Sequence, residues 1–324
     1  MANWNILIND GLEKSGVKAL EEAGINTDLV KKNQEDLAGI LNNYQGIIVR
    51  SATKVRKEHI DAAPGLQFIA RAGVGLDNVD AEYARSKGIE VINTPGASSR
   101  SVAELAMAHL LCLTRSLHRT NRELNGADRF NSLKKELSSS GEVRAKTLVL
   151  LGFGRIGSEL ARMAWGLGMK IVVVDPFIQE ARLSIDLGTQ SIEIELPVMS
   201  REQALPLADY LSLHAPFTGE CLMGKSQFEL LQPHCLLVNT SRGENIDESA
   251  LLEALNNGQL AGAGLDVFHQ EPQINPLLLQ HPRISVSPHI AASTREAQER
   301  IALELVDRVL ALYHIKSPLH SGSH

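Results

Sequence analysis

The chain has 324 residues, of which 44% are hydrophobic and 22% are charged, and its formal net charge at pH 7 is -6. This length predicts about two domains, and the composition is that of an ordinary folded α/β protein. The negative net charge argues against a broad basic surface, so we expect no nucleic-acid partner.

The cysteines and the apolar runs of the sequence indicate the cellular location that we expect. The cysteines are odd in number and have no metal-ligand spacing, which predicts no metal site and a reducing, cytoplasmic location; they are Cys112, Cys221 and Cys235. The first four residues show no signal-peptide pattern. The most apolar run, 105–113, is too short to span a bilayer, so we expect no membrane partner.

The first third of the chain alternates short apolar runs with amphipathic stretches. The amphipathic stretches 13–23 and 34–42 predict helices. Buried strands are predicted at Asn5–Ile8, Gly46–Val49, Leu66–Ala70 and Glu90–Ile92. This alternation predicts a small, doubly wound, flavodoxin-like α/β domain.

A turn-rich connector at 93–100 leads into a second region. Ser101 and Glu104 have the spacing of a capping box, which predicts a helix over 102–117. The polar stretch 119–142 is expected to form a surface arm. Strands are then predicted at 148–151, 171–174, 210–213, 236–239, 263–267 and 284–286.

The strand at 148–151 runs into a dinucleotide fingerprint, Gly152-x-Gly154-x-x-Gly157. Gly152 permits a tight turn, Gly154 lets the backbone approach a pyrophosphate, and Gly157 allows close packing of helix on strand. The N–H groups at the start of the following helix then face the phosphates. The next strand ends in Asp175, whose carboxylate can bind the ribose hydroxyls and would repel a 2′-phosphate, which predicts NAD rather than NADP.

Three later segments each end a predicted strand with a reactive side chain, namely Arg242, Glu271 or His289. The carboxyl ends of strands line the ligand crevice of an open α/β sheet. A histidine is suited to take the hydroxyl proton when a 2-hydroxy acid is oxidised, and a neighbouring carboxylate would orient it and raise its pKa. Arg242 can bind the substrate carboxylate through its planar set of donors.

The last helix is expected to begin at a capping box formed by Ser293 and Glu296, and to bury one apolar face. It is expected to return to the first domain, so that a Rossmann NAD-binding domain (98–290) is inserted into the substrate domain (1–97 and 291–324). Residues 317–324 are expected to be an unstructured tail.

These motifs, with Arg71 to Asp80 and Pro288 to Gln298, resemble the D-isomer-specific 2-hydroxyacid dehydrogenases over nearly the whole chain, and most of all the branch that oxidises 3-phosphoglycerate. The resemblance implies that Arg242, Glu271 and His289 are the catalytic set. It implies a homodimer and a small-molecule partner, a phosphorylated 2-hydroxy acid. It places NAD contacts at Val74, Gly152, Gly154, Arg155, Ile156, Gly157, Asp175, Ala215, Thr240, Ser241, Asp266, Ala291 and Ala292.

A predicted substrate site lies in the first domain. Cations and hydroxyls gather at the end of the strand 46–49, in a pattern suited to a phosphate, and the Gly73–Gly75 backbone could bind a carboxylate. The predicted residues are Arg50, Ser51, Thr53, Lys54, Arg71, Gly73, Val74 and Gly75.

Two alternatives stay open at this point. One is a dehydrogenase for a non-phosphorylated acid such as glyoxylate or hydroxypyruvate, which Arg50 and Lys54 would discriminate. The other is an NAD-sensing co-repressor, a binding module that shares this fold. The segment 188–198 is longer than the resemblance leads us to expect, and it carries no functional assignment.

Overall fold

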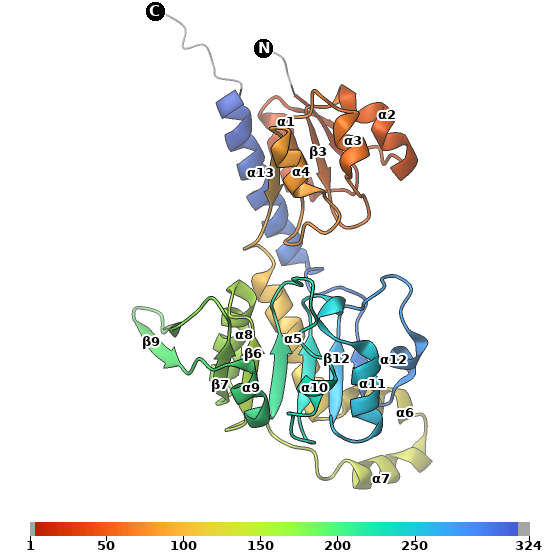
Figure 1. Ribbon diagram of the computed structural model, residues 1–324, viewed down its shortest axis with the longest axis vertical. Coiled ribbons are helices and arrows are strands. Elements are labelled where there is room, and N and C mark those ends of the chain that lie inside the picture. Colours follow the sequence, from red (N-terminus) through yellow and green to blue (C-terminus); the bar gives the residue numbers. More distant parts are fainter. Residues whose placement is uncertain (1–3, 317–324) are drawn as a thin grey trace, which may run out of the picture. The chain divides into compact units, whose positions relative to one another are not determined.

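The computed structural model describes residues 4–316 (Figure 1). The predicted tail at 317–324 lies outside the described residues. The chain divides into two compact units, one formed by the residues up to Ser98 with those from Ala292 onward, and the other by Ser99–Ala291. Both units are α/β with parallel central sheets, as predicted.

The first unit is built on a parallel sheet in the strand order β2-β1-β3-β4-β5, the flavodoxin-like order. In register, Leu7 lies opposite Ile47, and Ile47 opposite Ile69. The short polar edge strand β2 was not predicted. The strands are β1 (Asn5–Ile8), β2 (Asn26–Asp28), β3 (Gly46–Val49), β4 (Phe68–Arg71) and β5 (Glu90–Asn93).

Helices cover both faces of this sheet because successive strand residues point to opposite sides. Ile6 and Ile8 pack toward α1 and α13, whereas Leu7 packs into the cluster under α2, α3 and α4. The segment 34–42, predicted as one helix, is helical but divided into a short α-helix (α2) between two 3-10 helices, Gln34–Asp36 (η1) and Leu41–Asn43 (η2). The helices are α1 (Lys14–Glu22), α2 (Leu37–Ile40), α3 (Lys57–Asp61), α4 (Ala81–Ser86) and α13 (Arg295–Lys316).

Helix α13 lies against α1 (Figure 1). Its buried face includes Ile301, Leu305, Val309 and Tyr313, the residues spaced for one helical face. The predicted capping box is wrong by one residue, because the Thr294 hydroxyl, not Ser293, accepts the N–H of Ala297 at 3.2 Å.

The second unit contains a parallel sheet in the order β13-β12-β11-β10-β6-β7. Beyond β7, Val198 forms a single parallel bridge with Val173, in the place where the usual Rossmann order puts its third strand. The strand order therefore reverses between β6 and β10, where ligands bind in such sheets. The strands are β6 (Thr147–Leu151), β7 (Lys170–Val174), β10 (Tyr210–Leu213), β11 (Leu236–Asn239), β12 (Gly262–Leu265) and β13 (Ile284–Val286).

Two hydrophobic clusters flank this sheet. Helices α5 (Ser99–Thr114) and α8 (Arg155–Gly166) pack together over one face, onto residues such as Leu148, Leu150 and Val238. The other face is covered by α9 (Arg201–Ala204), η3 (Leu205–Leu207), α10 (Lys225–Phe228), α11 (Glu248–Asn256) and α12 (Pro276–Gln280).

The predicted capping box at Ser101 and Glu104 is wrong. Helix α5 already begins at Ser99, so Ser101 lies within its first turn and its hydroxyl donates to the Ala291 carbonyl at 2.5 Å. Glu104 forms an ion pair with Arg100 at 3.0 Å. The local sequence pattern was therefore outweighed by packing against another segment of the same unit.

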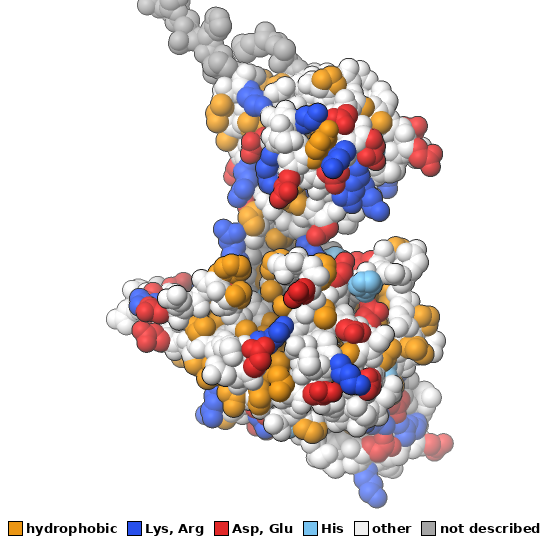
Figure 2. Space-filling view, viewed as in Figure 1, with side chains coloured by type: hydrophobic (Ala, Val, Ile, Leu, Met, Phe, Trp, Pro, Cys, Tyr) orange, Lys and Arg blue, Asp and Glu red, His pale blue; other side chains and the backbone are white. Residues whose placement is uncertain are grey.

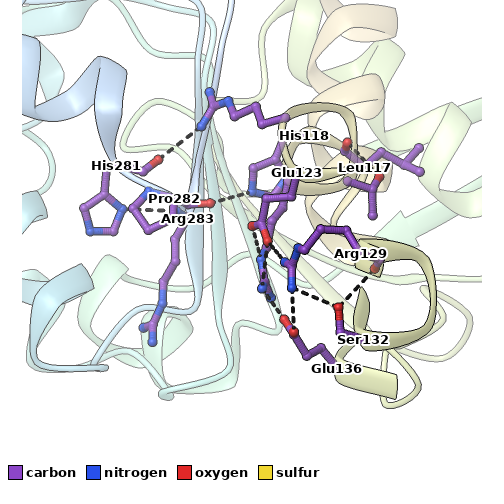
Figure 3. Close-up of polar contacts among 12 residues, drawn as sticks. Leu117, His118, Glu123, Arg129, Ser132, Glu136, His281, Pro282 and Arg283 are labelled. Atoms are coloured by element: carbon purple, nitrogen blue, oxygen red, sulfur yellow. Dashed lines mark hydrogen bonds and ion pairs between the residues drawn. The ribbon is translucent and has the colours of Figure 1, made fainter. Parts of the chain in front are cut away.

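The predicted arm forms two helices, α6 (Leu117–Glu123) and α7 (Ala127–Glu136), which follow a left-handed turn at Ser116. Glu123 and Glu136 both lie against Arg129, and Arg119 contacts the same two carboxylates (Figure 3). His118 Nε2 donates to the Pro282 carbonyl at 3.2 Å and so fastens α6 to the approach to β13. An ion-pair cluster thus ties α6 to α7, and Leu133 of α7 is buried.

The long segment after β7 forms an antiparallel hairpin, β8 (Ala181–Asp186) and β9 (Ser191–Leu196), which the sequence analysis did not predict (Figure 1). Its apolar face, which includes Leu183 and Leu196, packs into the cluster around α8. The residues between the strands turn through a hydrogen bond from Leu187 N–H to the Gln190 carbonyl at 2.7 Å.

Surface charge is mixed on the face shown in Figure 2, where acidic and basic side chains alternate without a large area of one sign. Among the described helices, none is long and apolar enough to cross a membrane.

Candidate active site

The loop between β6 and α8 has the close packing that its glycines predict. Gly152 adopts a φ of +99°, and a Cβ there would lie 2.8 Å from the Ala215 nitrogen in the loop after β10. A Cβ on Gly157 would lie 2.4 Å from the Gly152 carbonyl oxygen. Both positions need glycine because the helix, the turn and the neighbouring loop meet without room for a side chain.

Gly154 is different, because a Cβ there would meet no protein atom within 4 Å. It precedes the first turn of α8, where Arg155 is exposed and Ile156 is partly exposed. The backbone N–H groups of that turn and the cationic side chain form a cradle suited to a pyrophosphate. This open space fits a dinucleotide.

Asp175 follows β7 and reaches back to the glycine loop. Its Oδ2 accepts the Phe153 N–H at 2.9 Å, and its Oδ1 accepts the Phe177 N–H at 3.0 Å. The carboxylate is therefore fixed beside the loop, with lone pairs remaining on both oxygens. This is the position from which an acid binds the adenosine ribose in Rossmann domains.

The loop after β11 carries the predicted contacts Thr240 and Ser241. The Thr240 hydroxyl is buried and has no hydrogen-bond partner within the described part of the chain, so a ligand atom would satisfy it. The Ser241 hydroxyl donates to Asn239 at 2.8 Å. Asn245 donates to Ser241 and to the Ala215 carbonyl, at 3.0 and 2.8 Å, and joins this loop to the one after β10.

His289 and Glu271 form a direct pair. His289 Nδ1 lies 2.7 Å from Glu271 Oε2, and the Phe268 N–H donates to Oε1 of the same carboxylate at 3.0 Å. The hydrogen bond to Glu271 raises the pKa of His289, although burial and the charge of Arg242 oppose it. Burial works to raise the pKa of Glu271, but the hydrogen bond and charge of His289 dominate together and lower it.

Arg242 belongs to the same cluster, since its charge acts on both members of the pair. Its Nη1 donates to the Ser241 carbonyl at 2.7 Å. The following residue, Gly243, packs so tightly that a Cβ would lie 2.0 Å from the Phe268 carbonyl carbon. The loops that carry Arg242 and Glu271 are therefore locked together.

In the first unit, the loop after β3 is held by hydrogen bonds to polar side chains. Asp10 Oδ2 accepts the N–H groups of Arg50 and Thr53 at 2.7 and 3.0 Å, and its Oδ1 accepts the Thr53 hydroxyl at 2.7 Å. Asn78 donates to the carbonyls of Arg50 and Thr53 at 2.7 and 2.6 Å. The Thr53 hydroxyl thus shapes the loop, while Ser51 and Lys54 are exposed.

The neighbouring strand ends at Arg71, and its guanidinium lies over Gly73, where a Cβ would be 2.2 Å from Nη1. Asn93 donates to the Val74 carbonyl at 2.7 Å and so holds the Gly73–Gly75 turn. A cavity of about 190 Å³ in this unit is lined by Gly11, Leu12, Glu13, Arg50, Ala72, Gln298 and Ile301.

The predicted site residues thus fall into two groups. The catalytic set and most cofactor residues lie in the second unit, whereas the substrate residues, Val74 and Ala292 lie in the first. Sequence reasoning missed Asp10, Asn78 and Asn245. It also missed His214, whose buried ring bonds Ser212 at 2.9 Å and whose pKa burial lowers to about 4. His214 directly follows β10 and Asp10 lies two residues after β1, and this position at a strand end could have identified them.

Among residues 4–316, no group of three or more His, Cys, Asp or Glu side chains is placed to hold a metal ion.

Comparison with known proteins agrees with this geometry. Residues 107–291 match the family described as D-isomer specific 2-hydroxyacid dehydrogenase, NAD binding domain. The chain is 38% identical to hydroxypyruvate reductase from Thermotoga maritima, over 95% of this chain and 98% of that protein. It is 40% identical to D-3-phosphoglycerate dehydrogenase from Sus scrofa over 94% of this chain, but it spans only 56% of that relative.

A solved structure extends the likeness to the whole fold. An NADPH-dependent glyoxylate/hydroxypyruvate reductase from Sinorhizobium meliloti, in complex with NADP and malonate, aligns with a TM-score of 0.80 at 29% identity. The alignment covers 96% of this chain and 94% of that one. The chain therefore belongs to the D-isomer-specific 2-hydroxyacid dehydrogenases, a family of enzymes with a nicotinamide dinucleotide cofactor.

Proposed function

We propose that this enzyme oxidises 3-phospho-D-glycerate to 3-phosphohydroxypyruvate with NAD, a reaction that begins serine synthesis. The observation that carries the substrate assignment is the loop after β3. Asp10 and Asn78 fix its backbone, so Arg50 and Lys54 are presented from a preorganised turn. Two cations on a rigid loop suit a phosphate, because little ordering entropy is lost on binding.

The second unit supplies the proton chemistry. His289 Nδ1 is engaged with Glu271, so Nε2 carries the lone pair that accepts the proton of the substrate C2 hydroxyl. The same carboxylate then stabilises the imidazolium that forms. Arg242 binds the substrate carboxylate and polarises the developing 2-oxo group. When bound, the nicotinamide supplies the acceptor for the C2 hydride.

We infer a preference for NAD from Asp175. Its carboxylate is held beside the glycine loop by the N–H groups of Phe153 and Phe177, so it cannot swing away from an incoming ribose. A 2′-phosphate would meet this fixed negative charge. The NADPH-dependent relative shows that the fold also serves NADP. We therefore propose that Asp175 sets the preference in this chain.

The substrate proposal is tested by NADH formation at 340 nm, with 3-phosphoglycerate, D-glycerate and D-lactate supplied in parallel at alkaline pH with a product trap. Arg50→Ala should raise KM for 3-phosphoglycerate about tenfold or more, because a charge-assisted contact is lost. Arg85→Ala, which removes an exposed arginine from α4, is the matched control. Equal effects of the two changes would remove Arg50 from phosphate binding.

A second candidate substrate is hydroxypyruvate or glyoxylate. It is favoured by the hydroxypyruvate reductase of Thermotoga maritima, which this chain matches over nearly its full length. Turnover on D-glycerate that matches or exceeds turnover on 3-phosphoglycerate would support it. Cofactor binding without turnover of any hydroxy acid would favour the NAD-sensing reading instead.

We also infer that the enzyme is a homodimer, and that helices α6 and α7 form the contact. Leu117, Leu124 and Phe130 are each more than half exposed there, at 51%, 52% and 56%. Apolar side chains gathered on a rigid, ion-paired arm favour association with a second copy.

A further inference from the structure

A buried chain of hydrogen bonds runs from helix α5 to the turn that carries His289. His109 Nε2 lies 2.9 Å from the Ser287 hydroxyl, and that hydroxyl donates to Asp266 Oδ1 at 2.6 Å. The side chains of His109 and Asp266 are buried, with residue exposures of 5% and 0%. All of these residues belong to the second unit.

Asp266 holds the turn around His289 through consecutive backbone groups. Its carbonyl accepts the His289 N–H at 2.8 Å, its Oδ1 the Ile290 N–H at 2.9 Å, and its Oδ2 the Ala291 N–H at 2.9 Å. His289 itself has a φ of 53°, a left-handed conformation that costs a non-glycine residue free energy. The clamp therefore maintains a backbone conformation that the residue would not adopt unaided.

The donor and the acceptor of each hydrogen bond between His109, Ser287 and Asp266 can be assigned by starting from the Asp266 carboxylate. Asp266 accepts N–H groups with both carboxylate oxygens, so it is the acceptor in its contact with Ser287 as well. Ser287 therefore donates its single hydroxyl proton to Asp266. Ser287 can then only accept from His109, so Nε2 carries the proton. Burial lowers the pKa of His109, which keeps the ring neutral, and Nδ1 accepts from the Ser285 hydroxyl at 3.0 Å.

The close packing of His109 on strand β12 requires a glycine at position 264. A Cβ on Gly264, in strand β12, would lie 2.7 Å from the His109 Cβ and 3.2 Å from its Nδ1. The glycine thus admits the imidazole ring against the sheet, between Ser285 of the neighbouring strand β13 and Ser287, which follows that strand. A histidine buried here, where a leucine would serve packing alone, indicates a role in hydrogen bonding.

We propose that His109 is a positioning residue for His289, acting through Ser287 and Asp266. By donating to Ser287 it fixes the hydroxyl toward the carboxylate, and the carboxylate fixes the turn that aims the imidazole of His289 at Glu271. The kinetic part of this inference rests on the proposed function. The structural part concerns the turn alone and stands without it.

The test compares four variants of the full-length protein. His109→Leu removes the donor but keeps the volume, whereas His109→Gln keeps an N–H close to the place of Nε2. Ser287→Ala removes the middle link with a smaller change. Thr114→Val is the matched control, because it removes another buried hydroxyl from the same helix. That hydroxyl bonds Tyr210 at 3.0 Å and has no hydrogen bond to Asp266.

The first measurement is amide hydrogen exchange at residues 287–292. His109→Leu and Ser287→Ala should speed exchange of the Ile290 and Ala291 amides about tenfold, the factor expected when one net hydrogen bond is lost. His109→Gln should restore most of the protection, and Thr114→Val should leave it unchanged. This readout needs no substrate, so it separates failure of the inference from failure of the proposed function.

The second measurement is the pH profile of kcat/KM for oxidation. Loosening the turn should lower kcat about 10- to 100-fold. It should also move the rise of kcat/KM to lower pH, because the pKa of His289 falls when the hydrogen bond to Glu271 is weakened. The charged groups facing His289 are Glu271, Asp266 and Arg242, and those facing His109 are Asp266 and His118, all present in every variant.

Unchanged exchange in His109→Leu, or equal effects in His109→Leu and His109→Gln, would overturn the inference. If His109→Leu does not fold, Ser287→Ala provides the test instead. Amide exchange in Ser287→Ala as slow as in the Thr114→Val control would then refute the inference. Faster exchange with an unaltered pH limb would limit His109 to a structural role and would likewise overturn the positioning claim.

Discussion

Replacing either of two glycines in the loop between β6 and α8 by alanine should affect a different property of the enzyme. Gly154→Ala should weaken cofactor binding, whereas Gly157→Ala should lower the stability of the fold. In Gly154→Ala the added methyl group meets no protein atom within 4 Å, and the backbone at φ -73° and ψ -162° is open to alanine. In Gly157→Ala the methyl would lie 2.4 Å from the Gly152 carbonyl, so α8 must move away from β6.

The magnitudes follow from these distances. Overpacking of this kind costs about 1–3 kcal/mol, which should lower the Tm of Gly157→Ala by roughly 2–12 °C. Gly154→Ala should stay within about 1 kcal/mol of the wild-type stability. It should instead weaken NADH binding about tenfold or more, equivalent to about 1.4 kcal/mol, because the methyl occupies the space of the pyrophosphate.

The assay is thermal unfolding with and without NADH, combined with a fluorescence titration of NADH. Wild type at 100 times Kd should gain about 2.7 kcal/mol from the cofactor, and Gly154→Ala should lose about half of that gain at the same concentration. If Gly154→Ala is as unstable as Gly157→Ala, or if it binds NADH like wild type, the assignment of this space to the pyrophosphate is wrong.

Three further changes test other parts of the site. Glu271→Gln should return the pKa of His289 toward its ordinary value, move the rising limb of kcat/KM to lower pH and reduce kcat about 100-fold or more. The His289–Glu271 pair stabilises the fold only where both groups are charged, so the variant's loss of unfolding free energy should be largest near pH 5–6 and vanish in alkali. Asp175→Ser should raise kcat/KM with NADP relative to NAD, and an unchanged ratio would contradict the ribose assignment. Phe130→Glu should convert dimer to monomer in analytical ultracentrifugation, and a dimer that persists would place the interface elsewhere.

The periodic patterns of this chain predicted most of its parallel strands, because strands buried on both faces read as short apolar runs. The hairpin β8–β9 was missed, although apolar and polar residues alternate through 181–186 and 191–196, around a Gly188 with φ +83°. Capping boxes were less informative. At Ser101 the hydroxyl bonds the Ala291 carbonyl, 190 residues away, a contact that no local pattern could indicate.

At the candidate active site too, local patterns indicated which residues to consider, but not which distant residues contact them. The fingerprint glycines, Asp175 and the set of Arg242, Glu271 and His289 could be named from the sequence, because strand ends in such sheets face the ligand crevice. The sequence could not show that the Thr53 hydroxyl donates to Asp10, or that Asp266 is buried and binds the backbone of the His289 turn. Both facts depend on which distant polar groups become neighbours.

The sequence by itself therefore determined the fold class and the family, and it predicted the reactive groups, since each prediction rests on local spacing and on the order of motifs. Only the tertiary structure decided how those groups are held. The link from His109 through Ser287 to Asp266 joins helix α5 to residues more than 150 positions later. Such a chain forms only when packing has excluded water, because buried donors and acceptors must then pair with one another.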